Sequence, residues 1–572
     1  MLVHNADVAD IFNRFADLLE IDGANPFRVR AYRNAARTIA SLGQNATDMV
    51  RKGKDLTELP GIGKDLAQKI EEIVRTGSLS QLKELEAHIP GQLARLMKMP
   101  GLGPKRVRAL HERLGISTLE ELKMAAEKGK ISQLRGFGDK IEQMVLEEIG
   151  QVKKGERIKL VVAEEIGNAL VDHLKKVEGV KEVEVAGSYR RRKETVADLD
   201  ILVTCTEDAR VMDPFVNYEN VVKVLSQGET RSSVELRSGI QVDLRVVAEE
   251  SYGAALHYFT GSKAHNIAIR TLGVKKGLKI NEYGVFRNKK RIAGTREEEV
   301  FQSVGLPFIE PELRENWGEI EAAQRGQLPK LIAMKDIRGD FHTHTKATDG
   351  HNSLEEMAES ARALGYEYLA VTDHSQKVTM AHGFDARRLA QRIKEIDRLN
   401  AKLKGIILLK SIELDILKDG SLDLPDEILK ELDLTVCSVH YHFNLARKDQ
   451  TERIIRAMDN PYFSILAHPT GRLINQREPY DVDMELLIDA ARERGVFLEL
   501  NAHPDRLDLS DAHTKMAKEK GVRVAISTDA HRTTDLDFMH FGVGQARRGW
   551  LERDDVINTR RWEDVKKLLK RK

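Results

Sequence analysis

The pattern of apolar and polar positions changes twice along the chain. The first 150 residues predict short helices with almost no strands; in residues 25–42, apolar side chains recur at helical spacing after Pro26. From about 157 to 250, a helix is followed by the strand-like runs VEVAGSYRR, ADLDILVT and IQVDLRVV. Residues 253–317 are mixed, and the polar stretch 318–335 predicts an irregular linker. Beyond it, strands and helices alternate regularly, which predicts a parallel α/β architecture.

One short pattern recurs in the helical part. It occurs as LPGIGKDLAQKI (59–70), MPGLGPKRVRAL (99–110) and LRGFGDKIEQMV (134–145). Each copy is an apolar residue, a GxG turn and a helix start, and the third lacks the proline. A single GxG is usually only a turn, so the repetition is what makes the pattern informative.

Length and composition limit the class of protein. A chain of 572 residues is too long for one core, and 41% hydrophobic with 32% charged residues is typical of folded proteins. No apolar run is long enough for a transmembrane helix, and the N-terminus lacks a signal-peptide pattern. We therefore expect a cytoplasmic protein that does not bind a membrane. Cys205 and Cys437 lie in apolar runs and predict buried thiols. Residues 1–160 carry 27 Lys and Arg against 22 Asp and Glu, a modest bias toward an anionic partner.

Potential metal ligands follow the C-terminal strands. His342 and His344 lie two apart in FHTHTKATDG, so on a strand they would share a face. Alone they could equally be structural histidines. Seven strand-like runs follow the linker, however, and six end in a potential ligand: DFHTH, YLAVTDH, IILLKSIEL, LTVCSVH, FSILAHP and VAISTDAH. The seventh, VFLELNAH, ends in Asn501 and His503, to which we assign no role. In a barrel of parallel strands, chemistry collects at these strand ends.

The candidate ligands exceed the needs of one ion. They are His342, His344, Asp349, His374, Glu413, His440, His468, Asp529 and His531. Because one zinc or manganese ion takes about four to six ligands, the set predicts two or three ions with Glu413 or Asp529 bridging. Such a cluster activates a water and clamps a phosphate, which is phosphoester hydrolysis.

These motifs resemble the polymerase-and-histidinol-phosphatase (PHP) domain over residues 336–572. The resemblance implies a distorted (βα)7 barrel holding two or three Mn²⁺ or Zn²⁺ ions. It assigns Asp349, His374 and His531 to one ion, His342, His344, Glu413 and Asp529 to a second, and Glu413, His440 and His468 to a third. Arg472, after the HP motif, is either a phosphate contact or an ordinary loop arginine.

A second constellation of carboxylates lies in AGSYRRRKETVADLDILV (186–203). Asp198 and Asp200 share a strand face, and Asp243 lies on a strand that could pair beside it. Three clustered carboxylates repel one another unless cations neutralise them, as two Mg²⁺ ions do in phosphoryl transfer. Gly187 and Ser188, followed by Arg190 and Arg191, would supply a tight turn, a hydroxyl and guanidinium groups for a triphosphate. A DxD alone is usually a solvated strand edge.

The combination resembles the nucleotidyltransferase palm of the family X DNA polymerases, the relatives of DNA polymerase beta. YFTGSKAHNIAIR (258–270) matches their thumb motif, and INEY (280–283) is also similar. The resemblance implies a site for deoxynucleoside triphosphates with Mg²⁺ or Mn²⁺. It assigns nucleotide binding to Arg157, Gly187, Ser188, Arg191, Tyr258, Phe259, Gly261 and Asn266. Gln241 departs from the animal members, which have an arginine two residues before the third aspartate.

The N-terminal GxG turns resemble helix-hairpin-helix motifs, which bind a DNA phosphate through backbone N–H groups. The resemblance makes Gly61, Gly63, Gly101 and Gly103 candidate DNA contacts. Lys69 falls where that family's deoxyribose-phosphate lyase nucleophile lies, although a lysine here could equally bind a phosphate or face solvent. Asp65 and Arg28 replace lysines of lyase-competent animal relatives, which weakens the lyase hypothesis.

The leading hypothesis is a multidomain α+β and α/β enzyme that fills short gaps in DNA and processes 3′ ends. Its predicted units are listed by residue: a helical gap-binding domain (1–88), a second helix-hairpin-helix unit (89–156), the palm (157–252), the thumb (253–317), the linker (318–335) and the PHP domain (336–572). We expect a monomer acting on gapped or nicked DNA, with 3′-5′ exonuclease and also abasic-site endonuclease activity implied for the PHP domain. One alternative is a DNA-tethered phosphatase for a small phosphoester such as histidinol phosphate. Another is a DNA-binding scaffold with relict sites.

Overall fold

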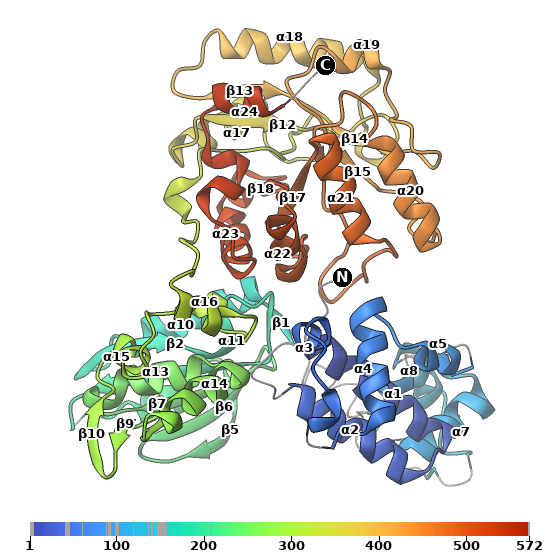
Figure 1. Cartoon of the computed structure of the whole chain (residues 1–572). Coiled ribbons are helices and arrows are strands. Elements are labelled where there is room, and N and C mark those ends of the chain that lie inside the picture. The colour runs from blue at the N-terminus through green and yellow to red at the C-terminus, as the bar shows by residue number, and fades with distance from the viewer. Residues whose placement is uncertain are drawn as a thin grey trace.

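The computed structural model describes most of the chain, with short gaps that fall mainly in the first 156 residues. The described residues are 5–40, 46–59, 61–86, 88–89, 93–97, 102–117, 119–134, 137–138, 141–142, 145, 157–207 and 209–569. They form a helical part in blue, a mixed part in cyan to green and a parallel α/β part in yellow to red (Figure 1). Gly101 and parts of the third GxG copy (134–145) lie outside the described residues.

The described residues of the first part contain helices and no strand. The helices are α1 (Asn5–Asp22), α2 (Pro26–Ala40), α3 (Ala46–Arg51), η1 (Leu56–Glu58), α4 (Lys64–Thr76), α5 (Ser80–Glu86), α6 (Leu93–Leu96), α7 (Pro104–Leu114) and α8 (Leu119–Glu127). Their apolar faces form one core, in which Phe12 and Phe15 meet Tyr32 edge-on at centroid distances of 5.5 and 4.8 Å. Helices α4 and α7 begin directly after Gly63 and Gly103, as the GxG pattern predicts.

The second part is built on a mixed five-stranded sheet in the order β2-β4-β7-β6-β5. The strands are β2 (Val180–Val185), β4 (Asp198–Cys205), β5 (Val221–Gln227), β6 (Arg231–Leu236) and β7 (Gln241–Val246), beside the short pair β1 (Ile158–Lys159) and β3 (Thr195–Val196). The helices are α10 (Leu160–Leu174), α11 (Gly187–Arg190) and α12 (Met212–Val216). Strands β2, β4 and β7 are the three predicted ones, although β2 ends at Val185 because α11 follows. Sequence analysis missed both β5 and β6; β5 is an edge strand whose side chains are mostly exposed and therefore show no apolar alternation.

A smaller unit follows the sheet. It contains η2 (Glu249–Ser251), α13 (Tyr252–Thr260), α14 (Lys263–Lys275), β8 (Leu278–Asn281), β9 (Gly284–Arg287), β10 (Lys290–Ala293), α15 (Glu297–Ser303), η3 (Pro311–Leu313) and α16 (Glu319–Arg325). The prediction of an irregular linker is wrong for its first half, because α16 buries Ile320 and Ala323 in this unit's core. Glu319 is also buried and lies 2.7 Å from Nδ1 of His265.

The third part holds only parallel strand pairs among its described sheets, in the orders β11-β12-β13 and β14-β15-β16-β17-β18. The strands are β11 (Gly339–Asp340), β12 (Tyr368–Val371), β13 (Ile407–Lys410), β14 (Glu413–Asp415), β15 (Val436–Ser438), β16 (Ile465–Leu466), β17 (Phe497–Asn501) and β18 (Val524–Ser527). Isolated parallel bridges, His374 to Glu413 and Thr343 to Ala530, join the two sheets at both edges. A complete barrel stays a prediction, and these bridges are what its closure requires.

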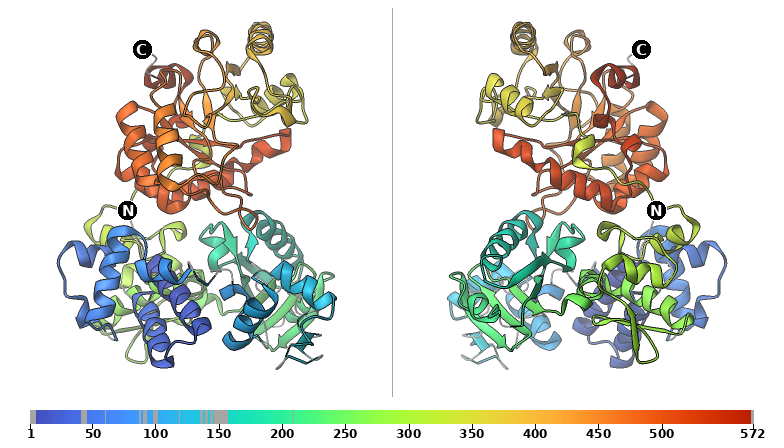
Figure 2. Two further views of the ribbon diagram at one scale, coloured as in Figure 1. Left: turned by 90° about the vertical axis from the view of Figure 1, so that its right-hand side faces the viewer. Right: turned by 90° about the vertical axis from the view of Figure 1, so that its left-hand side faces the viewer.

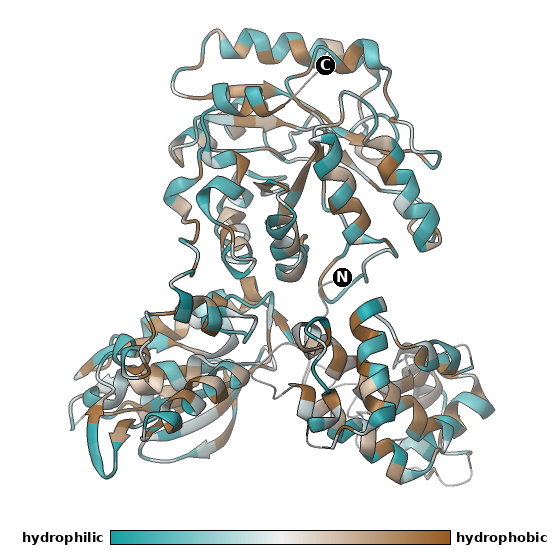
Figure 3. Cartoon of the chain, in the orientation of Figure 1, coloured by the Kyte–Doolittle hydropathy of each residue, from teal (hydrophilic) through white to brown (hydrophobic). Residues whose placement is uncertain are grey.

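Amphipathic helices accompany these strands. The α-helices are α17 (Leu354–Ala363), α18 (Ala386–Asn400), α19 (Asp426–Leu429), α20 (Arg447–Ala457), α21 (Met484–Arg494), α22 (Asp511–Glu519), α23 (Met539–Arg548) and α24 (Trp562–Leu568). The short 3-10 helices of this part are η4 (Met334–Asp336), η5 (Thr379–Ala381), η6 (Thr533–Phe538), η7 (Arg553–Asp555) and η8 (Ile557–Thr559). Polar and apolar residues interleave along them (Figure 3). In α18, Leu389, Ile393 and Ile396 are buried at a spacing of three to four residues, which places them on one face.

The third part rests on the second through several ion pairs, and Figure 2 shows the two in contact from opposite sides. Arg472 binds Glu194 at 2.6 Å, and His540 lies 2.7 Å from Glu164. Lys159 also pairs with Asp505. These contacts join residues about 280 to 380 positions apart, so the sequence pattern could not have revealed them.

Two expectations about the environment can be compared with the described residues. No helix among them is both long and apolar enough to cross a membrane. Cys205 and Cys437 do not form a disulfide; Cys437 is buried as predicted, whereas Cys205 is only half-buried at the end of β4.

Candidate active sites

The three palm carboxylates meet because β4 and β7 are parallel neighbours. Asp200 pairs with Asp243 across the two strands, and Asp198 pairs with Gln241. Asp198 is exposed and Asp243 is buried, so the group, at the start of two interior strands of the sheet, is open to a solvated ligand on the Asp198 side. The predicted shared face and strand pairing are confirmed in this geometry.

The electrostatics of this group favour cation binding. Burial, together with the charges of Asp198 and Asp243, raises the pKa of Asp200 to about 6. Asp243 is held from the other side, since Ser233 donates to its Oδ1 and Gln241 donates to its Oδ2 at 3.0 Å. Burial and like charge therefore concentrate negative charge at a point that a divalent cation would neutralise.

Two glycines give ligands access beside the carboxylates. A Cβ atom at Gly187 would lie 2.9 Å from Oδ2 of Asp200, and one at Gly261 would lie 3.1 Å from Nη1 of Arg191. Both glycines have positive φ angles of 64° and 70°. Ser188 follows on α11 and is half-buried.

Four further predicted nucleotide-binding side chains contact neighbouring residues. The rings of Tyr258 and Phe259 lie 5.0 Å apart edge-on, and Asn266 donates to the carbonyl of Tyr258 at 2.7 Å. Arg157 donates to the Thr195 hydroxyl at 2.9 Å; burial lowers the pKa of Arg157, and neighbouring Asp198 opposes that shift.

Arg190 and Arg191 make different contacts. Arg190 binds Glu297 with two nitrogens at 3.0 and 2.8 Å and the Thr260 hydroxyl at 2.7 Å, so it joins the sheet to the unit that follows. The idea that Arg190 serves a triphosphate is not supported by this arrangement, because its donors are taken. Arg191 uses Nε for Glu315 at 3.0 Å and Nη1 for the Thr260 carbonyl.

The N-terminal GxG turns leave open space at helix starts. A Cβ atom at Gly61, Gly63 or Gly103 would meet nothing within 4 Å, and Gly63 and Gly103 each precede a helix of more than ten residues. Backbone N–H groups there are accessible to an anion. Lys69, on α4, is buried and donates to Asp65. To act as a nucleophile, its ammonium would have to leave this ion pair and lose a proton.

The nine predicted ligands of the third part converge around Glu413. One carboxylate oxygen of Glu413 lies 2.8 Å from His374, and the other lies 3.2 Å from His440 and 3.0 Å from His468. Nε2 of both His342 and His344 lies about 3.5 Å from the first oxygen. Burial raises the pKa of Glu413, but His374, His440 and His342 outweigh it and hold that pKa well below its usual range.

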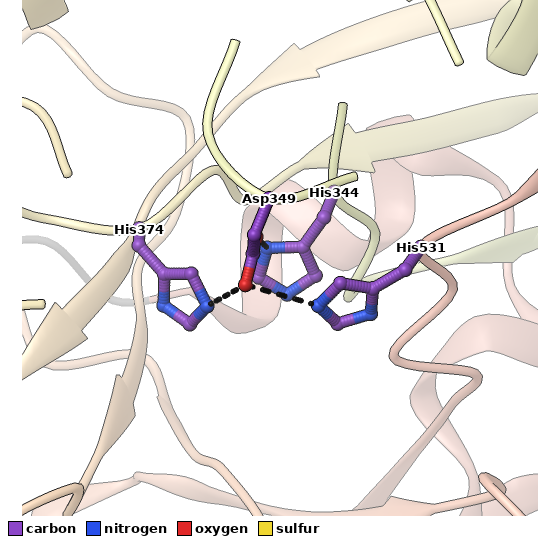
Figure 4. A group of neighbouring side chains, drawn as sticks. All are labelled: His344, Asp349, His374 and His531. Carbon is purple, nitrogen blue, oxygen red and sulfur yellow. Dashed lines mark hydrogen bonds and ion pairs between the residues drawn. The ribbon is translucent and has the colours of Figure 1, made fainter. Parts of the chain in front are cut away.

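A second carboxylate and a more exposed group complete the cluster. Oδ1 of Asp529 lies 3.5 Å from His342 and 3.2 Å from His344. Asp349 faces three imidazoles, with separations of 3.6 Å to His344, 3.1 Å to His374 and 3.5 Å to His531 (Figure 4).

The chemistry of these donors fits metal ions. Three sets of side chains bring ligand atoms within 4.8 Å of one another: His344, Asp349, His374 and His531; His342, His344 and Asp529; and His374, Glu413 and His440. Nε2 of His342 and both ring nitrogens of His344 are buried without a hydrogen-bond partner. Buried imidazole nitrogens without partners are costly unless a cation binds them. His344 and His374 each belong to two of these sets, whereas the predicted division assigned each of them to a single ion.

Comparison with known proteins agrees with the order of these parts. Family models match residues 3–79 (helix-hairpin-helix domain), 93–151 (SAM-like helix-hairpin-helix tandem), 157–239 (DNA polymerase beta palm), 255–315 (DNA polymerase beta thumb) and 340–503 (PHP domain). Over 574 residues and the full length of both proteins, the chain is 39% identical to the DNA polymerase/3'-5' exonuclease PolX of Bacillus subtilis (strain 168).

The chain belongs to the family X DNA polymerases that carry a C-terminal PHP domain. It is also 31% identical over 233 residues to a probable phosphatase of Thermoanaerobacter sp. (strain X514), covering 38% of this chain and 89% of that protein. A probable phosphatase of Caldanaerobacter subterraneus subsp. tengcongensis is 32% identical over 209 residues, or 34% of this chain and 77% of the relative. The polymerase and PHP families are both families of metal-dependent enzymes, which agrees with the carboxylate and histidine clusters of this chain.

Several residues that orient the PHP ligands were missed by sequence reasoning. Glu499 accepts from Nδ1 of His342 at 2.7 Å, and Asp415 lies 3.2 Å from Nδ1 of His440. Asn501, left without a role, donates to Asp529 at 3.1 Å. Such partners fix imidazole orientation and carboxylate position around metals. The alternation in VFLELN placed Glu499 and Asn501 on one strand face, a signal that could have found them.

Arg472 is committed to a contact between domains. Besides the Glu194 pair, it donates to the carbonyls of Arg506 and Leu507 and is largely buried. The phosphate-contact interpretation therefore loses its support, because none of these donors faces the metal ligands freely.

Proposed function

We propose that this family X chain is a DNA-directed DNA polymerase that fills short gaps, with a PHP domain that removes nucleotides from DNA 3′ ends. The observation that carries the proposal is the presence of two separate clusters in one chain. One is the aligned trio Asp198, Asp200 and Asp243, and the other is the histidine cluster around Glu413. The name of the full-length Bacillus relative combines the same two activities.

The palm trio is proposed to hold Mg²⁺ or Mn²⁺. Two divalent ions there would lower the charge on the triphosphate and assist attack by the primer hydroxyl. Asp200 lies beside Gly187 and pairs with Asp243 across the strands, and the exposed Asp198 extends the site toward solvent. Gln241 and Ser233 keep the Asp243 carboxylate fixed for this role.

The remaining proposed nucleotide contacts divide by chemistry. Gly187, Ser188, Arg157 and Arg191 offer backbone, hydroxyl and guanidinium donors suited to a triphosphate. Tyr258 and Phe259 would contact the sugar and Gly261 the nucleotide backbone, while Asn266 would meet the base through the amide atoms that its Tyr258 contact leaves available.

The PHP cluster is proposed to hold two or three Mn²⁺ or Zn²⁺ ions. Those ions would supply an activated water and neutralise the phosphodiester. Glu413 is positioned to bridge, because its two oxygens face different histidines. Incision at abasic sites is a further activity that such a cluster would support.

The helical units, about 1–88 and 89–156, are proposed to bind gapped or nicked DNA through the Gly61, Gly63, Gly101 and Gly103 turns. We place the palm at 157–252 and the thumb from 253, extended to about 325 because α16 packs in its core. The PHP domain then follows from 336. The further proposal is that the protein works as a monomer in the cytoplasm.

The decisive experiment follows a 5′-labelled primer on a gapped duplex with Mn²⁺, with and without deoxynucleotides. We expect growth with nucleotides and shortening without them. Asp200→Asn should remove growth alone, and Glu413→Gln should remove shortening alone, so each variant is the control for the other. Loss of both activities in either variant would contradict two independent sites.

The phosphatase alternative has its own outcome. If histidinol phosphate is hydrolysed but a DNA 3′ end is not, the PHP domain acts on small phosphoesters and the exonuclease proposal fails. Growth that survives Asp198→Ala with Asp200→Ala would refute the polymerase site.

A further inference from the structure

A buried arginine of the PHP domain reaches the polymerase half. Arg548, the last residue of α23, has a side chain only 1% exposed. Its Nη1 donates to Glu315 at 3.0 Å and to the backbone carbonyl of Arg191 at 2.7 Å. Its Nε donates to Asp511 of α22 at 3.1 Å, so the guanidinium is anchored within its own domain.

Glu315 connects this arginine to the nucleotide site. The same oxygen of Glu315 that accepts from Arg548 also accepts from Nε of Arg191 at 3.0 Å, and Lys193 lies 3.9 Å away. Burial raises the pKa of Glu315, but Arg191, Arg548 and Lys193 outweigh it and hold that pKa far below its usual range. Glu315 is therefore a charged, nearly buried bridge between two arginines from different domains.

These contacts fix the side chain of Arg191, whose charge acts on the palm carboxylate Asp200. Nε is taken by Glu315 and Nη1 by the Thr260 carbonyl, while Nη2 has no hydrogen-bond partner among the described residues. A Cβ atom built at Gly261 would lie 3.1 Å from Nη1 of Arg191, so Arg191 adjoins a residue proposed to contact the nucleotide. Burial raises the pKa of Asp200, and the positive charge of Arg191 acts in the opposite direction. Nη2 is therefore the donor that Arg191 has left for an anionic ligand.

We propose that Arg548 is a positioning residue for nucleotide binding, acting from the PHP domain through Glu315 on Arg191. This rests on the proposed polymerase function and on the role of Arg191 within it. Without Arg548, Glu315 loses one of its hydrogen-bond donors. The backbone carbonyl of Arg191 also loses the hydrogen bond that it accepts from Arg548. The Arg191 guanidinium is then more mobile, so fixing it on a triphosphate costs more conformational entropy.

Arg547 provides a matched control. It neighbours Arg548 on α23 and also crosses to the thumb, where it binds Glu312 at 2.7 Å. It further donates to the carbonyl of Ile332, in the segment between thumb and PHP domain, at 3.0 Å. None of its contacts involves Glu315 or Arg191. A loss that comes only from weaker domain docking would therefore follow Arg547→Met as well as Arg548→Met.

The test is single-nucleotide gap filling under steady-state conditions with the full chain. Arg548→Met should raise the KM for the deoxynucleotide about tenfold with little change in kcat. Arg547→Met should leave KM within about twofold. In an Arg191→Met background, the added Arg548→Met change should have no further effect on KM, because the side chain through which Arg548 acts is already absent.

Folding of each variant is checked by its 3′-end shortening activity. If Arg548→Met loses that activity too, Asp511→Asn and Arg548→Lys replace it: the first should raise KM in the same direction, and the second should restore part of the wild-type KM. Equal KM changes in the Arg547→Met and Arg548→Met variants would overturn the proposal. An undiminished effect of Arg548→Met on KM in the Arg191→Met background would overturn it as well. A wild-type chain that does not extend primers would instead defeat the proposed function.

Discussion

Asp200 should lower the stability of the palm while serving catalysis. Burial and the charges of Asp198 and Asp243 raise its pKa from 3.8 to about 6. None of the described residues donates a hydrogen bond to this carboxylate. Asp200→Asn should therefore remove charge repulsion without breaking a hydrogen bond.

The size of the effect follows from linkage. A pKa raised by about two units costs the ionised, metal-free folded state about 3 kcal/mol at pH 8, since each unit is about 1.4 kcal/mol. The sign is that of a raised carboxyl group: the native state binds the proton more tightly, so stability falls as pH rises from the unfolded to the folded pKa. At pH 5 the cost should be about half as large.

Hydrogen exchange on peptides from β4 and β7 would measure this in the palm itself, because the whole chain does not unfold as one unit. In metal-free buffer at pH 8, Asp200→Asn should increase protection by up to about 3 kcal/mol, and by about half that at pH 5. Asp172→Asn, an exposed site on α10, should change nothing. Mg²⁺ should stabilise the wild type and not the variant. Equal or lower protection in Asp200→Asn at pH 8, or the same gain at both pH values, would refute the electrostatic account.

Three other outcomes follow from the contacts. Glu499→Gln should weaken Mn²⁺ binding at the PHP site about 10- to 100-fold, measured by titration of 3′-end shortening, because Glu499 orients His342; rescue by excess Mn²⁺ separates this from misfolding, and unchanged Mn²⁺ dependence would contradict it. At subsaturating Mg²⁺, primer extension by the wild type should increase as pH rises through about 6, because Asp200 ionises and can then bind the ion, and a flat profile from pH 5 to 8 would count against this. Borohydride should trap little Lys69 adduct on an abasic gap, and Asp65→Ala should increase trapping by freeing the Lys69 amine; strong trapping in the wild type would show that the Asp65 pair is no barrier.

Local spacing determined much of both sites. Two residues apart on a strand means one face, so DxD and HxH could be assigned to shared sites from the sequence alone. The GxG pattern likewise placed the starts of α4 and α7 correctly, because glycine turns and helix starts are decided by neighbouring residues. The recurrence of ligands after successive strands predicted one site, and eight of the nine side chains do fall into three overlapping ligand sets, while His468 contacts Glu413 of one of them.

Tertiary structure decided which distant groups complete those sites. The edge strand β5 and helix α16 escaped prediction because exposure or charge hides their apolar pattern, and only packing shows which face is buried. Arg191 and Arg472 carry the same donors, yet Arg191 pairs with Glu315 and Arg472 pairs with Glu194. The Glu315 bridge to Arg548 joins residues 233 positions apart. A short motif specifies a local face, whereas such a partnership exists only once whole domains have packed together.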